Sequence, residues 1–559
     1  MSKLRSAVVG TLALVALAAC SEKTLTVVDL NQPDQGRALA SASDVENLLT
    51  SQYRVIWNQT QGTVVSLEMQ LECLGMESST GLGNAESGKS CGLPRTPVDN
   101  SINNPSATNK YNPYLYLYRA ARSVALALSQ MYKPGFGFVP SDPAEYARDL
   151  AFGYMEMGVA LGNVALVYDS GAVVTYSDNL GGSASPLVSA DSLMTISLAY
   201  LDSALAYGAQ NPAGVTGWGV NDQTWINGWD GSQTTFLQLV HSWKARLRAG
   251  VARTPAERAA VNWASVISDA QAGITSDFNI TMTTGQPNWS YNPNQMSAST
   301  TWSQMWQWIV GMADTSGHYA AYLNDRVNNG VFLVVTPDLR FPRGLHRDSL
   351  SAADTGVAGS QNLNSKAILS NNSYPYIQNH KASIDVTVQP EQTSQYNWWR
   401  FQSEIANSAS NGPIPVIPVA EMHMLIAEGK LRGGAQHDFA GADALINLTR
   451  QAAGLPAVVG DSGAAVPGTA VNCVPKVPDP GAAYKAPKCG TVWEAMKWEK
   501  RLEEAYTSWG AWWIDGRGWG DLPAGSVEEY PTPYQELQTR LEPIYSTSRQ
   551  TPGTGTYGL

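Results

Sequence analysis

Helix signals recur along this chain in pairs, and they constrain its fold more than any other feature. Leu193, Ile196, Tyr200, Ala204 and Tyr207 form one face of a helix that ends at Gly208. Phe236, Val240, Trp243, Leu247 and Gly250 repeat that spacing. Apolar residues three and four positions apart indicate amphipathic helices that pack against one another. A mainly α protein is therefore predicted.

Capping signals place several helix starts. Asp142-Pro143-Ala144-Glu145 and Thr254-Pro255-Ala256-Glu257 each combine a capping box with proline at the first helical position. The start at Thr254 predicts one helical segment that runs to Gly273. Ser43 with Glu46 forms another possible capping box and predicts a helix over 43–55. The pairs recur at spacings of roughly 35 to 45 residues, which resembles helical hairpins of tetratricopeptide type. An unrelated helical bundle is the alternative.

The stretch 277–415 has a different character. Gly, Pro, Ser, Thr and Asn replace the helical patterns, and aromatic residues are concentrated there. The whole chain has 18 Trp and 24 Tyr but 9 Phe, so much of its aromatic area has a polar edge that suits contact with sugars. Irregular segments on a rigid scaffold often carry binding residues. The candidate ligand-binding residues are Trp289, Tyr291, Trp302, Trp306, Trp308 and Trp398.

The first 19 residues are typical of a bacterial export signal. Lys3 and Arg5 precede the short apolar run 7–16, and Leu17-Ala18-Ala19-Cys20 resembles a lipobox. Cleavage before Cys20 would let its sulfur and its freed amine carry acyl chains, and two or more chains anchor a protein firmly. An ordinary secretory signal is the alternative. After Cys20 we expect no apolar run near the ~20 residues that cross a bilayer.

The other four cysteines fall in two close pairs, Cys73 with Cys91 and Cys473 with Cys489. Two local disulfides are the simplest interpretation in an oxidising compartment. A different pairing or a metal site is the alternative, but no C-x-x-C motif and no nearby histidine supports zinc. We expect no metal and no cofactor. The formal net charge of -11, with scattered Lys and Arg, makes nucleic acid a poor partner.

Several motifs resemble the SusD/RagB-like outer-membrane nutrient-binding lipoproteins, over nearly the whole mature chain. In order they are Asp338-Leu339-Arg340, Pro415 to His423 with Ala427-Glu428, Ala444 to Arg450 with Ala453-Gly454-Leu455-Pro456, Glu499 to Glu503, and Gly510 to Gly520. Leu339 stands where the family has proline, and Trp512 stands where it usually has arginine.

This resemblance implies tetratricopeptide-type hairpins packed against an irregular, loop-rich half that binds ligand. It implies a non-catalytic lipoprotein on the outer face of the outer membrane, which captures a glycan or a peptide and delivers it to a TonB-dependent transporter of SusC type. We expect a signal peptide (1–19), a lipid-anchored tether (20–40), an N-terminal helical-repeat part (41–276), an irregular ligand-binding part (277–415) and a C-terminal helical part (416–559), within one SusD-like domain.

Two other functions are weighed. A lipid-anchored glycoside hydrolase would need two carboxylates across one cleft, but adjacent Glu503 and Glu504 point in different directions on a helix. Ser462 in Gly460-Asp461-Ser462-Gly463 lies in a loop without an organised base, which disfavours a serine protease. A protein-binding scaffold on the cell surface is the third function. Trp512, Trp513 and Trp519, at a glycine-rich helix end, are interpreted as a packed structural corner.

Overall fold

The structure, a computed structural model, describes most of the chain from residue 39 onward. The described residues are 39–62, 67–81, 83, 86–137, 143–178, 185–210, 225–229, 231–284, 288–289, 304–329, 332, 334–341, 376–379, 394, 396–398, 400–401, 411–546 and 549–559. Cys20, Tyr291 and Trp302 lie outside them, as does the predicted cap Asp142.

Helices dominate the described residues, which confirms a mainly α fold. The α-helices are α3 (Ala42–Thr50), α4 (Gln52–Trp57), α5 (Leu67–Leu74), α6 (Ser87–Cys91), α7 (Ala107–Met131), α8 (Pro143–Val167), α9 (Ala190–Ala209), α10 (Gln233–Gly250), α11 (Pro255–Ala260), α12 (Trp263–Gln271), α14 (Gln307–Gly311), α15 (His318–Asn324), α18 (Val419–Leu431), α19 (Phe439–Ala452), α20 (Val492–Glu504), α21 (Ala511–Trp519) and α22 (Tyr534–Arg540). The strands are β1 (Ser170–Ala172), β2 (Leu187–Ser189), β3 (Phe278–Met282), β4 (Ile377–Asn379), β5 (Tyr396–Trp398), β6 (Gly412–Ile417), β7 (Lys476–Pro478) and β8 (Pro487–Cys489).

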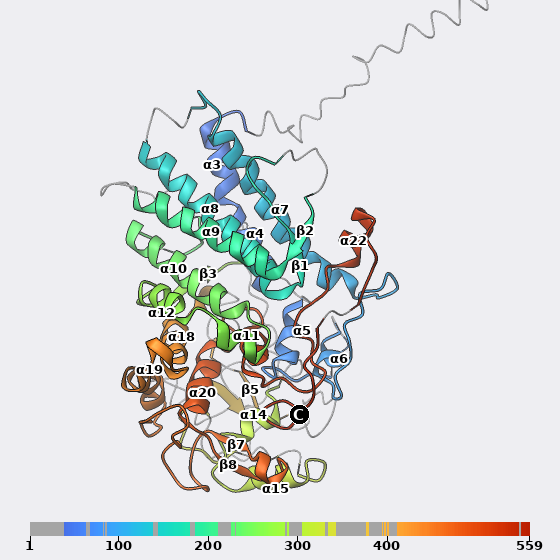
Figure 1. Ribbon diagram of the computed structural model, residues 1–559, viewed down its shortest axis with the longest axis vertical. Helices are drawn as coiled ribbons and strands as arrows, with labels where there is room; N and C mark the ends of the chain where they lie inside the picture. Colours follow the sequence, from blue (N-terminus) through green and yellow to red (C-terminus); the bar gives the residue numbers. More distant parts are fainter. Residues whose placement is uncertain are drawn as a thin grey trace, which may run out of the picture.

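The long helices stack in a series (Figure 1). α7 packs on α8, α8 on α9, α9 on α10, and α10 on α12. The series continues on α18, which lies much further along the chain and packs in turn on α19 and α20. Each helix buries its apolar face against a neighbour, as helical repeats do.

The strands form small antiparallel pairs: β1 with β2, β3 with β6, β4 with β5, and β7 with β8. The β3–β6 pair places Ile280 opposite Ile414, both fully buried. Because β3 follows α12 and β6 precedes α18, this pair brings the C-terminal helices onto the N-terminal stack. The β7–β8 hairpin and α15 lie at the opposite end of the molecule from α3 (Figure 1).

α8 is the central helix of the N-terminal half. Its stretch Glu145–Val167 is long and apolar enough to cross a membrane, with a mean hydropathy of 1.5, but that apolar window is 100% buried inside the structure. The expectation of no apolar run near 20 residues is therefore wrong. The run exists because α7, α9 and α10 enclose this helix.

Two glycines on α8 allow this close packing. A Cβ at Gly158 would lie 2.7 Å from Cγ of Leu201, and one at Gly162 would lie 2.6 Å from a methyl carbon of Leu247. The Ser197 hydroxyl on α9 donates to the Gly158 carbonyl at 2.6 Å. Larger side chains would separate these helices, so glycine is needed for close approach here rather than for a turn.

The capping box at Thr254 is confirmed. Its hydroxyl accepts from the Glu257 N–H at 3.2 Å, and the Glu257 carboxylate accepts from the Thr254 N–H at 3.2 Å. The expectation of one helical segment to Gly273 is wrong. Asn262 interrupts it, because its side chain caps α12 by accepting from the Ser265 N–H at 3.1 Å.

The first described helix also starts at a different residue from the one predicted. Ser41 and Asp44 form its capping box, instead of Ser43 and Glu46. Glu46 forms an ion pair with Arg148 on α8 at 2.5 Å. Glu46 therefore pairs with a residue of another helix instead of capping its own helix, as the local sequence pattern predicted.

Candidate functional site

Four of the six predicted ligand-binding aromatics are described, and all four are buried. The exposed fraction is 3% for Trp289, 1% for Trp306, 1% for Trp308 and 2% for Trp398. The Trp306 indole donates to the Ser78 carbonyl at 2.6 Å, and the Trp398 indole donates to the Glu77 carbonyl at 3.3 Å. Protein covers these four rings in the structure, and their contact with a ligand stays a prediction.

The tryptophans of α21 form the predicted structural corner. Trp512, Trp513 and Trp519 are all buried. The Trp512 indole donates to the Arg501 carbonyl at 2.8 Å, and the Trp513 indole donates to the Val527 carbonyl at 2.8 Å. These rings hold α21 against α20 and the C-terminal segment.

The charged residues of the C-terminal motifs pair with one another inside the core. Arg340 lies 2.8 Å from Asp338, 2.8 Å from Glu499 and 3.2 Å from Glu503. Buried charges of this kind need partners, because an unpaired charge costs several kcal/mol. Glu504 pairs with Lys500 at 2.9 Å. The adjacent Glu503 and Glu504 therefore hold different cations.

A second buried group joins two of the motif segments to α11. Arg258 on α11 lies 2.7 Å from Glu428 on α18 and 3.1 Å from Asp515 on α21. Burial would raise the pKa of Glu428, but Arg258 and Arg432, the latter 2.6 Å away, hold it at about 2. The motif residues thus maintain the fold and are unavailable for contact with a ligand.

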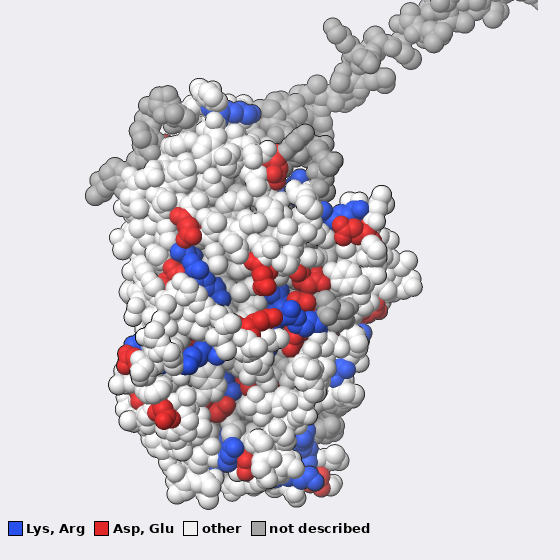
Figure 2. Space-filling model, in the orientation of Figure 1, with Lys and Arg blue, Asp and Glu red and all other residues white. Residues whose placement is uncertain are grey.

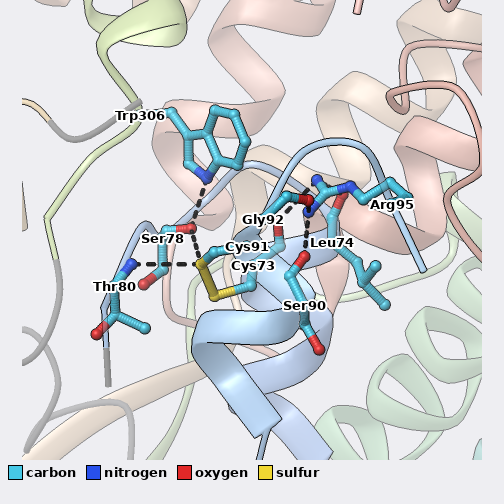
Figure 3. The surroundings of a disulfide bond; sticks show 9 residues. All are labelled: Cys73, Leu74, Ser78, Thr80, Ser90, Cys91, Gly92, Arg95 and Trp306. Carbon is cyan, nitrogen blue, oxygen red and sulfur yellow. Dashed lines mark hydrogen bonds between the residues drawn. A yellow bond between two sulfur atoms is a disulfide. The ribbon is translucent and has the colours of Figure 1, made fainter. Parts of the chain in front are cut away.

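A disulfide closes the loop between α5 and α6. Cys73 at the end of α5 joins Cys91 at the end of α6, with their Cα atoms 4.5 Å apart (Figure 3). Within this loop, the Ser79 N–H donates to the Gln304 carbonyl at 2.6 Å, and the Gln304 N–H donates back at 2.9 Å. The loop is therefore fastened to the irregular part of the chain.

Arg95 fixes the base of this loop. Its guanidinium donates to the carbonyls of Cys73 at 3.2 Å and Leu74 at 3.3 Å, and also to the Ser90 carbonyl (Figure 3). These carbonyls lie at the ends of α5 and α6, where no intrahelical donor reaches them. Burial lowers the pKa of Arg95 to about 9, so the group remains a cation at neutral pH.

Beside Arg95 lies a small cleft, which we term the α6 cleft, with a volume of about 20 Å³, enough for about one water molecule. Its lining comprises Gln70, Leu74, Glu86, Lys89, Ser90, Arg95, Thr96, Pro97, Val98, Asp99, Lys110, Val527 and Tyr530. Polar side chains at its rim, such as Lys89 and Asp99, can each contact a single group of a larger ligand.

The α6 cleft is lined by three cations, Lys89, Arg95 and Lys110, and two carboxylates, Glu86 and Asp99. Glu86 pairs with Lys110 and lies 3.5 Å from Lys89, whose side chain is 45% exposed. Asp99 accepts from the Ser101 N–H at 2.9 Å, and this hydrogen bond lowers the pKa of Asp99. Burial lowers the pKa of Lys110. Paired cations and carboxylates can donate to and accept from the hydroxyls of an uncharged ligand.

The sequence reasoning did not single out the residues of the α6 cleft. The signal available was the polar stretch Arg95-Thr96-Pro97, which directly follows a loop closed by cysteines. The cleft also needs Val527 and Tyr530, which are more than 400 residues from that stretch. Only the tertiary fold brings them together.

The second predicted cysteine pair is also joined. Cys473 and Cys489 form a disulfide with Cα atoms 5.7 Å apart, next to the β7–β8 hairpin. Lys476 on β7 donates through its backbone N–H to the Met312 carbonyl at 2.7 Å. This disulfide thus fastens a hairpin that is hydrogen-bonded to Met312, the residue after α14.

Two solved structures show which fold this is. A SusD-like carbohydrate binding protein from Bacteroides fragilis aligns with a TM-score of 0.52 at 13% identity, covering 92% of this chain and 95% of that one. A SusD homolog from Parabacteroides distasonis also aligns with a TM-score of 0.52 at 13% identity, covering 91% and 97%. No protein-family model matches the sequence. No curated protein matches it either.

Proposed function

We propose that this chain, which has the SusD-like fold, is a non-catalytic surface lipoprotein that binds a glycan and delivers it to a TonB-dependent outer-membrane transporter. The observation that carries the proposal is the likeness over 92% of the chain to a carbohydrate-binding protein of this fold. The polar side chains at the rim of the α6 cleft could add hydrogen bonds to single sugar hydroxyls.

The ionisation state of the carboxyl groups in the α6 cleft bears on whether the protein binds a glycan without hydrolysing it. A glycosidase needs one carboxyl group that stays protonated to act as a general acid. In the α6 cleft, hydrogen bonding lowers the pKa of Asp99, and Glu86 is held between Lys89 and Lys110. The surroundings of Asp99 favour its ionised carboxylate, which accepts hydrogen bonds from a ligand but donates no proton.

Affinity electrophoresis tests the glycan-binding part of this proposal. The chain is run through native gels that contain soluble starch, β-glucan, xylan, galactomannan or polygalacturonate. We expect at least one polymer to retard the protein, and we expect Lys89→Ala or Asp99→Ala to weaken that retardation. Lys485→Ala, at an exposed lysine of the β7–β8 hairpin, is the matched control. Retardation by none of the polymers would contradict the proposal.

The lipid anchor and the transporter are tested separately. Mass spectrometry of the natural protein is expected to show acyl chains on an N-terminal Cys20. Extraction in mild detergent is expected to recover the protein together with a barrel of TonB-dependent type. An unmodified amino terminus would contradict the lipid anchor, and a protein found consistently alone would contradict the transporter partner. Neither result bears on glycan binding, which the gels test.

A further inference from the structure

Four tyrosines lie together on the helical half, and one of them, Tyr176, is 40% exposed. Tyr132 follows α7, Tyr154 lies on α8, Tyr207 lies on α9, and Tyr176 lies in the segment after β1. The Tyr132 and Tyr176 ring centroids are 4.6 Å apart, and the Tyr154 and Tyr207 rings stack at 5.6 Å with an interplanar angle of 4°. We term these four residues the tyrosine cluster.

The hydroxyl groups of this cluster have hydrogen-bonding capacity to spare. The Tyr132 hydroxyl lies 2.9 Å from that of Tyr154 and 3.0 Å from that of Tyr207. Three phenols carry three protons, and two hydrogen bonds use two of them. At least one O–H therefore remains to donate elsewhere. Burial raises the pKa values of Tyr132 and Tyr154, which keeps these groups protonated at neutral pH.

The exposed ring is held in place by its own loop. Tyr176 is 40% exposed, although large aromatic side chains are usually covered. Next to it, Asp178 accepts from the Thr175 N–H at 2.8 Å and from the Thr175 hydroxyl at 2.6 Å. The Tyr200 hydroxyl on α9 donates to the Val174 carbonyl at 2.6 Å. The loop thus presents Tyr176 at a defined position beside the three phenols.

We propose that the tyrosine cluster is a second carbohydrate site, which binds a sugar ring against Tyr176 and bonds its hydroxyls through the phenols. An exposed ring covers the apolar face of a sugar, and the spare O–H donates a hydrogen bond to one of its hydroxyls. This proposal rests on the proposed glycan binding and extends it to the opposite end of α7. Lys110 of the α6 cleft and Tyr132 are 22 residues apart along α7, or roughly 33 Å at the helical rise.

Two sites at that separation give a specific expectation for polymers. A long glycan that reaches both sites gains avidity, since the second contact forms within one complex. A short oligosaccharide gains none. Loss of the tyrosine cluster should therefore weaken binding of a polysaccharide more strongly than binding of a short oligosaccharide of the same sugar.

The test compares variants of the full chain, purified in mild detergent, on gels that contain the five named polysaccharides. Tyr176→Ala removes the exposed ring, and Tyr207→Phe removes one hydroxyl but keeps its ring. We expect the apparent Kd for the retarding polymer to rise about tenfold or more for the first, as lost avidity implies, and by a smaller factor for the second. Tyr116→Ala, at another tyrosine of α7, should change nothing.

The outcomes separate this proposal from the proposed function. If Lys89→Ala weakens retardation and neither cluster variant does, the second site is refuted and glycan binding stands. If no polymer retards the unaltered protein, both fail. Vesicles of phosphatidylethanolamine and phosphatidylglycerol form a further arm. Binding to vesicles that depends on Tyr176, without retardation by a polymer, would identify a membrane contact and overturn the sugar site. Unchanged melting temperatures show that the variants are folded.

Discussion

Arg95 is the residue on which the geometry of the α6 cleft most depends. It donates to carbonyls at the ends of two helices and to the Ser526 hydroxyl at 3.1 Å. Arg95→Met should lower the free energy of unfolding by about 3 kcal/mol, because it removes the donor to the Leu74 and Ser90 carbonyls, while the Cys73 carbonyl keeps the Met76 N–H. Urea unfolding measures this change. Lys133→Met, at an exposed cation, should lie within about 0.5 kcal/mol of the unaltered chain. Equal effects would contradict the role of Arg95.

Glu77 should make stability depend on pH. Burial raises its pKa from 4.5 to about 8, and its carboxylate accepts from the Tyr506 N–H at 2.7 Å. Because the folded state holds this proton more tightly than the unfolded state, the contribution is complete below about pH 4.5 and is lost as the pH rises through about 8. Glu77→Gln should reduce the fall in melting temperature over this window.

The control for Glu77 is Glu542→Gln, which alters an exposed carboxylate. That variant should retain the full pH dependence. If Glu77→Gln also retains it, then the Glu77 proton does not contribute, and the dependence must come from another group. Buried Glu72, whose pKa burial also raises, is the first to examine because it lies close enough to interact with Glu77.

At the scale of elements, the contact between α8 and α9 is set by Gly158. Gly158→Ala would place a Cβ 2.7 Å from Leu201 and 3.0 Å from the Ser197 carbonyl. We expect a loss of about 1 to 3 kcal/mol from overpacking. Gly137→Ala, where a Cβ would meet no atom within 4 Å, is the matched control. Thermal unfolding of both variants measures the difference, and equal melting temperatures would contradict this account of the contact.

Helices were predictable where local chemistry decides them. The Thr254 box satisfies its own backbone donors, so its sequence sufficed. Prediction failed where distant groups compete. Glu46 pairs with Arg148 instead of capping a helix, and the short side chain of Asn262 starts a new helix inside an apolar pattern. The apolar run of α8 is explained only by the helices around it.

At the scale of the whole molecule, the fold was more predictable than the site. The motif residues Arg340 and Glu499 need opposite charges, because each is the buried ion-pair partner of the other. The proposed second site depends on which aromatic rings remain uncovered, and composition does not determine that. Trp306 and Trp398 are covered, whereas Tyr176 is exposed. Acidic and basic side chains are intermixed on the face in Figure 2, so no patch of one charge indicates a site there.

The central claim is that the protein captures a glycan and leaves it intact. Isothermal titration calorimetry of the full chain against the five soluble polysaccharides, with the size of each polymer measured before and after, tests this most directly. The account predicts saturable binding to at least one polymer whose size does not change. Shortening of the polymer, or heat indistinguishable from dilution for all five, would contradict it.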